Sequence, residues 1–109
     1  MRRADAEKAA IRADVFDRDG ACVLSNFAGH RCQGPPTPHH LKKASQGGGY
    51  TADNIVTLCS TGNTWVEDEP FAAHRLGLVV RHGDTLEDAW ERMRAAGLVT
   101  YDPEGNPLT

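Results

Sequence analysis

The stretch PTPHHLKKASQGGGYTADNIVTLCSTGN, from Pro36 to Asn63, carries most of the information in this chain. It holds two adjacent histidines, His39 and His40, then a glycine-rich gap, an apolar β-branched run and a polar turn. The β-branched run is typical of a strand, and three consecutive glycines permit unusual backbone angles or a close approach to a ligand. The stretch therefore predicts a short strand at the histidines, a loop, a strand over residues 54–59 and a helix that begins near Asn63.

Upstream of this stretch, the sequence predicts a helix, a short strand and a long loop. Residues 4–17 are rich in alanine and have apolar residues four apart, which favours an amphipathic helix. Gly20 follows as a usual stop signal. Residues 21–25, ACVLS, are typical of a short strand, and residues 26–38 read as a loop because they contain three prolines and two glycines.

Downstream, the pattern predicts two helices, a strand and a terminal hairpin. Pro70 suits the first position of a helix that continues over residues 71–76. Residues 76–81, LGLVVR, are typical of a strand. Residues 84–96 have an apolar face at helical spacing and predict a second, amphipathic helix. Residues 98–108 predict a short hairpin, since a turn-forming run lies at their centre.

Length and composition indicate one small domain. A chain of 109 residues supports a single core, and 39% of these residues are hydrophobic. No run approaches the roughly 18 apolar residues of a membrane span. The charged residues at the start of the chain do not form a secretory signal. We therefore expect no membrane association and a cytoplasmic location.

The charges are unevenly distributed along the chain. Residues 20–52 contain no acidic residue and three basic ones, Arg31, Lys42 and Lys43. Residues 53–109 contain ten acidic and four basic residues, and the net charge of the whole chain is −3. The histidine pair thus lies in the only locally cationic segment. Such a segment attracts phosphate even in a slightly acidic protein.

The order of these elements resembles the HNH endonuclease motif, the ββα-metal fold of many nucleases. The segments that carry the resemblance are RDGACVLS, HHLKKASQGGGYTADNIVTLC and GNTWVEDEP. The chain is most similar to the small HNH proteins encoded by bacteriophages and prophages. The resemblance implies an α+β fold in a single domain over residues 1–109. Its ββα-metal core covers about residues 15–80, with an N-terminal helix before it and a C-terminal helix plus short hairpin over residues 84–109.

The same resemblance assigns roles to four residues. His40 takes the place of the base that activates the attacking water, and His39 that of the first metal ligand. Asn54 takes the middle asparagine position, which steadies the loop and the base. Asn63 falls where the family usually has its final histidine, the second metal ligand, so the triad reads His-Asn-Asn. An amide oxygen suits hard ions better than zinc, which makes Mg²⁺ or Mn²⁺ the expected cofactor.

The function that the resemblance implies is metal-dependent DNA cleavage. The enzyme would hydrolyse phosphodiester bonds to leave 3′-hydroxyl and 5′-phosphate ends, by nicking or double-strand cutting, with low sequence specificity. Lys42 and Lys43 are candidates for phosphate contacts. Similar phage proteins assist DNA packaging, so the expected partners are DNA and phage terminase or portal proteins, in the host cytoplasm.

The cysteines do not fit the zinc pattern of this family. Many relatives hold a structural zinc through two CxxC pairs, and the second cysteine of each pair is missing here. A site made of Cys22, Cys32, Cys59 and His30 can be drawn, but its spacing matches no standard zinc pattern. We therefore do not expect a structural zinc. An odd number of cysteines also argues against a disulfide framework.

Two alternative functions remain open at the level of sequence. The first is a catalytically weakened HNH-fold module that binds DNA or protein without cutting, with Asn63 as the sign of that loss. The second is a small interaction domain stabilised by zinc.

Overall fold

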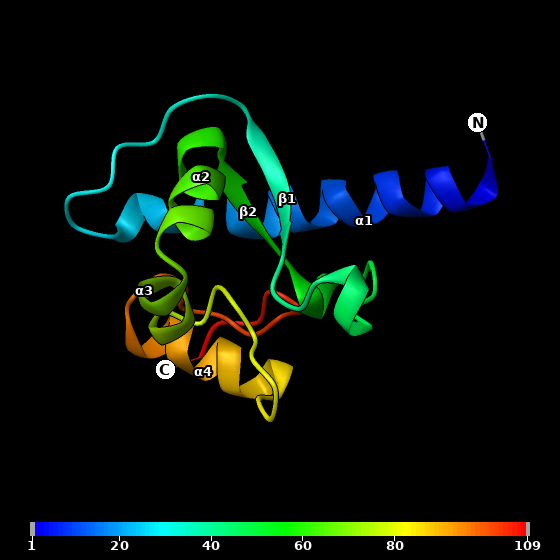
Figure 1. The fold of residues 1–109 in the computed structure, drawn as a ribbon. Helices are drawn as coiled ribbons and strands as arrows, with labels where there is room; N and C mark the ends of the chain where they lie inside the picture. Colours follow the sequence, from blue (N-terminus) through cyan, green and yellow to red (C-terminus); the bar gives the residue numbers. More distant parts are fainter. Residues whose placement is uncertain (1, 109) are drawn as a thin grey trace.

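An α+β fold is formed by residues 2–108, the part of the chain that this computed structural model describes (Figure 1). Within that part lie four α-helices and one two-stranded antiparallel sheet, which confirms the predicted α+β class. Of the helices described, none is both long and apolar enough to cross a membrane. In chain order the elements are α1 (Arg3–Asp19), η1 (Val23–Asn26), β1 (Pro36–His40), η2 (Ala44–Gln46), η3 (Ala52–Asn54), β2 (Ile55–Cys59), α2 (Ser60–Asp68), α3 (Pro70–Arg75) and α4 (Leu86–Ala95), where η marks a short 3₁₀ helix.

The two strands form the hairpin that carries the histidine pair. Strand β1 runs antiparallel to β2, from Pro36 opposite Cys59 to His40 opposite Ile55. The strand begins before the histidines, so the predicted loop over residues 26–38 extends too far. Its two prolines are tolerated because β1 has a partner on one side only, and alternate backbone nitrogens face away from that partner.

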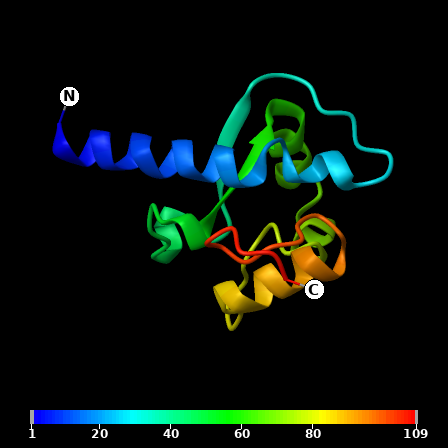
Figure 2. The same ribbon diagram turned by 180° about the vertical axis from the view of Figure 1, so that it is seen from behind.

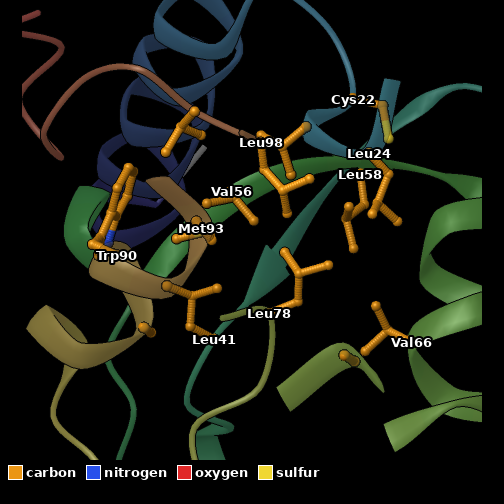
Figure 3. Close-up of a cluster of buried hydrophobic side chains, with 14 of the residues drawn as sticks. Cys22, Leu24, Leu41, Val56, Leu58, Val66, Leu78, Trp90, Met93 and Leu98 are labelled. Carbon is orange, nitrogen blue, oxygen red and sulfur yellow. The ribbon is translucent and has the colours of Figure 1, made fainter. Parts of the chain in front are cut away.

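The hairpin lies between α1 and α2 (Figures 1 and 2). Helix α1 crosses one face and its N-terminal half extends beyond the rest of the molecule, while α2 follows β2 directly on the other side. Because both faces are covered, all five residues of β2 are buried. Strand β2, helices α2, α3 and α4 and the segments between them share one apolar core (Figure 3). Its most completely buried members include Leu41, Val56, Leu58, Leu78, Trp90, Met93 and Leu98.

Two of the predicted strands are wrong. Residues 21–25 were expected to be extended, but η1 replaces the strand and buries both Val23 and Leu24. The 3₁₀ turn brings the side chains of both residues into the same core. Residues 76–81 form no ladder within the described chain. They contribute a single backbone hydrogen bond to the end of β1, from Val80 N to Leu41 O at 2.9 Å.

The observed helices agree with the predicted ones more closely than the strands do. Helix α1 ends at Gly20, whose φ of 71° is a conformation that favours glycine. Helix α3 begins, as predicted, with its proline. Helix α4 begins later than predicted because Thr85 and Asp88 form a capping box. The predicted terminal hairpin is reduced to a single bridge between Tyr101 and Pro107.

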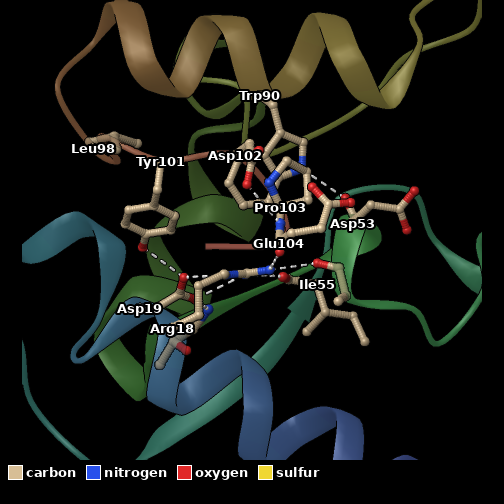
Figure 4. A network of polar contacts seen from close by, with 12 residues as sticks. Arg18, Asp19, Asp53, Ile55, Trp90, Leu98, Tyr101, Asp102, Pro103 and Glu104 are labelled. Carbon is tan, nitrogen blue, oxygen red and sulfur yellow. Dashed lines mark hydrogen bonds and ion pairs between the residues drawn. The ribbon is translucent and has the colours of Figure 1, made fainter. Parts of the chain in front are cut away.

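Arg18 and Asp19, at the end of α1, attach the C-terminal residues to the hairpin (Figure 4). The Arg18 guanidinium donates to the carbonyl oxygens of Ile55 at 2.7 Å and Pro103 at 2.9 Å. Asp19 accepts the Tyr101 hydroxyl at 2.7 Å and also pairs with Arg18. The start of β2 is therefore fixed by two segments from opposite ends of the chain, and the site described next is built on that fixed hairpin.

Candidate active site at the histidine pair

His39 lies on β1 with one ring nitrogen held by a backbone carbonyl. Its Nε2 is 2.6 Å from the carbonyl oxygen of Leu78. Because a carbonyl oxygen only accepts, Nε2 carries a proton and the lone pair of the neutral ring lies on Nδ1. Burial lowers the pKa of His39, while hydrogen bonds to Leu78 and Asn63 oppose that shift. The result is a neutral, oriented imidazole, which is the form of histidine that ligates metal ions.

Asn63 reaches the same place from α2. It lies in the first turn of that helix, whose N-terminus is capped by Cys59. The Asn63 side chain lies next to His39, where it acts to raise the pKa of that ring, and its Nδ2 donates to Thr37 Oγ1. Thr37 and His39 are two positions apart on β1, so their side chains lie on one face of the strand. The fold thus brings together the two residues that the sequence assigns to metal binding.

His40 has a different environment. As the next residue of β1 it projects from the other side of the strand. Its ring meets the Tyr50 ring edge to face, with 5.3 Å between the ring centroids. Among the hydrogen bonds of residues 2–108, none involves the His40 ring, so its nitrogens are free to bind a water molecule. The aromatic contact orients the imidazole without occupying those nitrogens.

Asn54 closes the long loop between the strands. Its side chain is buried, and its Oδ1 accepts the Lys42 N–H at 2.8 Å. Its Nδ2 donates to the carbonyls of Lys42 at 3.0 Å and Gly49 at 2.9 Å. Gly48 passes so close to this network that an added Cβ would lie 1.9 Å from the Lys42 carbonyl oxygen. Asn54 therefore fixes the loop that directly follows His40, but it does not touch the ring.

A small pocket of about 80 Å³ lies beside the histidines. His39, His40, Lys43 and Glu67 all contribute to its lining. Lys42 instead lines a separate hollow of about 180 Å³, together with Gln46 and His82. Of the two candidate phosphate-binding lysines, only Lys43 thus shares the pocket with the histidine pair.

Glu67 is a candidate site residue that the sequence analysis missed. It lies on α2, four residues after Asn63, so the two side chains project from the same side of the helix. Its negative charge favours the protonated form of His39 and so acts to raise the pKa of that ring. The helical spacing from Asn63 was the signal that could have identified it.

A second cluster of metal-binding residue types lies at the other end of the hairpin. The ligand atoms of Cys22, His30, Cys32 and Cys59 all lie within 4.8 Å of one another, so the cluster could bind a metal ion. Burial raises the pKa of the Cys59 thiol, but hydrogen bonds from Thr61, His30 and nearby backbone N–H groups outweigh it and lower the pKa to about 5. No structural zinc was expected from the spacing of these four residues, but the fold brings all four together.

Comparison with known proteins adds no evidence about this site. No protein-family model matches this chain, and neither a curated protein nor a solved structure resembles it closely enough to count as a match. The case for a function therefore rests on the residues and their arrangement.

Proposed function

We propose that this protein is a metal-dependent DNA endonuclease of the HNH type, in which β1, β2 and α2 form a ββα-metal core. The observation that carries the proposal is that His39 on β1 and Asn63 on α2 lie next to each other. The adjacent His40 ring makes no hydrogen bond among the described residues. Strand, loop, strand and helix follow one another in the order that the motif requires.

The residues present fit a divalent ion of the Mg²⁺ or Mn²⁺ type. His39 offers one ring nitrogen while a backbone carbonyl fixes the other, an arrangement common among metal-ligating histidines. Asn63 offers an amide oxygen, and Glu67 a carboxylate in the same pocket as His39. Oxygen donors with a single imidazole suit hard ions better than zinc. A bound ion would polarise the phosphoryl group and stabilise charge on the leaving oxygen.

His40 supplies the base in this account. Its free ring nitrogen accepts a proton from a water molecule, which is the role of a general base. The water oxygen then bonds to phosphorus while the bond from phosphorus to the 3′-oxygen breaks. The leaving 3′-oxygen takes a proton from solvent, which gives 3′-hydroxyl and 5′-phosphate ends. Tyr50 keeps the His40 ring in place, and Asn54 holds the loop that follows.

Recognition of DNA would depend mainly on phosphate. Lys43 is exposed and lines the histidine pocket, where it can meet the backbone of a bound strand. Phosphate contacts carry little sequence information, so we propose weak specificity and salt-sensitive binding. Targeting would then come from a partner, for which a phage terminase or portal protein is our proposal.

A nicking assay on supercoiled plasmid tests the proposal. Wild-type protein should convert supercoiled plasmid to the relaxed form with Mg²⁺ or Mn²⁺, and EDTA should stop the reaction. His82→Ala, which removes an exposed histidine that does not line the histidine pocket, provides the control for nonspecific effects of losing an imidazole. A wild-type protein that leaves the plasmid intact with both metals would exclude the nuclease.

One observation favours a second candidate, a catalytically weakened module that binds DNA without cutting. The Asn63 amide already contacts both Thr37 and His39, so it can act as a packing residue on β1. Gel-shift measurements on the same plasmid separate the two functions. Binding without cleavage would support the weakened module, whereas cleavage that depends on added metal would support the nuclease.

A further inference from the structure

The four residues of the cysteine–histidine cluster come from three separate parts of the fold. Cys22 immediately precedes η1, and Cys59 ends β2 and caps α2. His30 and Cys32 lie in the loop over residues 27–35. Cys22 and Cys59 are buried, His30 is partly buried and Cys32 is exposed. Four sulfur and nitrogen donors from distant positions therefore converge beside the core.

This cluster is separate from the candidate active site. Cys59 pairs with Pro36 at one end of the hairpin, whereas His40 pairs with Ile55 at the other. At about 3.3 Å per strand residue, the two ends lie about 13 Å apart. The donor sets also differ, since the cluster offers three thiols and an imidazole, whereas the histidine pocket offers imidazoles and the Glu67 carboxylate and no thiol.

The spacing of the donors matches a tetrahedral zinc ion. With zinc–sulfur bonds of about 2.3 Å, the sulfurs of a tetrahedral site lie about 3.8 Å apart. The four donor atoms all lie within 4.8 Å of one another, and His30 Nε2 is 3.5 Å from Cys59 Sγ. Small movements of the side chains would therefore complete the coordination. Thiolates with one imidazole select zinc over Mg²⁺ or Ca²⁺.

Simple hydrophobic packing does not explain the cluster. Cys32 is exposed, so it adds little to the core, yet its thiol points at the two buried cysteines. Gly62 packs against the cluster, and an added Cβ there would be 3.5 Å from both Cys22 Sγ and Cys59 Sγ. Because glycine has no side chain, position 62 of α2 supplies no ligand. The fourth donor is His30 on the loop.

Beyond Phe27, which packs against Trp65, the loop has few other attachments. Apart from His30, residues 28–36 are exposed, so almost no apolar burial holds them. Their polar attachment to α2 runs through Thr61, whose Oγ1 donates to Arg31 O at 2.8 Å and accepts the Gln33 N–H at 3.1 Å. A metal ion bound by His30 and Cys32 would fix this loop at its centre.

We propose that Cys22, His30, Cys32 and Cys59 bind one structural zinc ion that fastens the 27–35 loop to η1 and to the start of α2. This ligand set is distinct from the paired CxxC arrangement and uses the loop to supply two of its members. The ion would stabilise the end of the hairpin where β1 begins and where α2 follows β2. The proposal does not depend on nuclease activity.

Metal analysis of purified protein tests the site, together with thermal unfolding before and after a strong zinc chelator. Wild type should retain about one zinc ion per chain, and the chelator should lower its thermal midpoint. Replacement of zinc by Co²⁺ should give a sulfur-to-cobalt charge-transfer band in the near ultraviolet. His30→Ala and Cys32→Ser, both in the loop, should lose most of the metal and most of the chelator effect.

Two matched variants make the result specific. Arg31→Ala changes the exposed residue between the two loop ligands and should keep its zinc and its response to chelator. His39→Ala should also keep its zinc, which excludes binding at the active-site pocket. The proposal is overturned if wild type holds no zinc, gives no charge-transfer band with Co²⁺ and unfolds at the same temperature with chelator. Loss of zinc in His39→Ala but not in Cys32→Ser would overturn it as well.

Discussion

Asn54 and Lys42 exchange two hydrogen bonds, one in each direction, across the loop that joins the strands. Asn54 Oδ1 accepts the Lys42 N–H at 2.8 Å, and its Nδ2 donates to the Lys42 carbonyl at 3.0 Å. The Asn54 side chain therefore pairs with the backbone of Lys42, as a neighbouring strand would. It holds the chain immediately after His40, so the position of the proposed base depends on a residue that does not touch it.

Replacement of Asn54 by alanine should destabilise the protein strongly. The change leaves the backbone N–H and carbonyl of half-buried Lys42 without their side-chain partner, and it opens a space where the buried Asn54 side chain was. An unsatisfied buried group costs about 1–3 kcal/mol, so we expect a loss of about 1–3 kcal/mol in the free energy of unfolding. Urea denaturation measures it. Gln46→Ala, an exposed change in the same loop, is the control, and equal stability of the two variants would contradict the role of Asn54.

Gly48→Ala and Gly49→Ala form a matched pair that tests the close packing of the glycine-rich loop. A Cβ at Gly48 would overlap the Lys42 carbonyl oxygen, whereas one at Gly49 would meet only Thr51 Cγ2 at an ordinary 3.6 Å. We expect Gly48→Ala to lose about 1–3 kcal/mol of stability because the loop must move. Gly49→Ala should change stability by less than about 0.5 kcal/mol. Urea denaturation of both variants checks this, and a larger effect at Gly49 would disprove the observed loop path.

Asp84 should give the protein a pH-dependent contribution to stability in acid. The Arg81 backbone N–H, then the side chains of His74 and Arg92, lower the pKa of this carboxylate below its usual value of 3.8. The unfolded chain therefore binds a proton first, so the contribution is complete above about pH 3.8 and is lost as the pH falls towards the folded pKa. Asp84→Asn should flatten the dependence of the free energy of unfolding on pH in that window.

Chemical denaturation between neutral pH and the acid limit of the folded state measures this slope. Asp68→Asn removes an exposed carboxylate that has no hydrogen bond or ion pair among the described residues, so it is the control. A slope for Asp84→Asn equal to that of wild type, with the control unchanged, would show that the contact with His74 adds nothing.

Two substitutions of Asn63 should affect metal binding differently: one should weaken Mn²⁺ binding, and the other should change which ion the site prefers. Asn63→Ala removes the amide oxygen next to His39 and should weaken Mn²⁺ binding. Asn63→His adds a second imidazole and should shift the preference of the site towards zinc and other nitrogen-loving ions. Electron paramagnetic resonance of free Mn²⁺ measures the binding. Circular dichroism shows whether each variant is folded, and unchanged Mn²⁺ affinity in folded Asn63→Ala would remove Asn63 from the site.

The sequence predicted the elements whose signals are local. Strand β2 and helix α3 were anticipated because β-branched residues and a proline at the first helical position act within a few residues. The strand expected over residues 21–25 failed because two adjacent apolar residues had to enter one core, which depends on tertiary packing. The strand expected over 76–81 failed because an extended segment needs a partner, and no ladder forms there in the part of the chain described.

The same difference between local signals and tertiary packing separates the candidate site residues that were predicted from those that were not. His39, His40 and Asn63 were identified because the motif fixes their spacing along the chain. Glu67 and the cysteine–histidine cluster were missed or set aside because three-dimensional proximity, rather than a standard spacing, defines them. A loop as irregular as residues 27–35 has no periodicity from which the direction of its side chains can be read.

The central claim is that His40 activates water for DNA cleavage, and the relaxation of supercoiled plasmid by wild type and His40→Ala with Mn²⁺ tests it most directly. Loss of a general base slows a reaction by about 10²- to 10⁴-fold, so the variant should leave the plasmid supercoiled under conditions in which wild type relaxes it. Unchanged thermal unfolding would show that the variant is folded. Equal rates for the two folded proteins, or no cleavage by wild type, would contradict the claim.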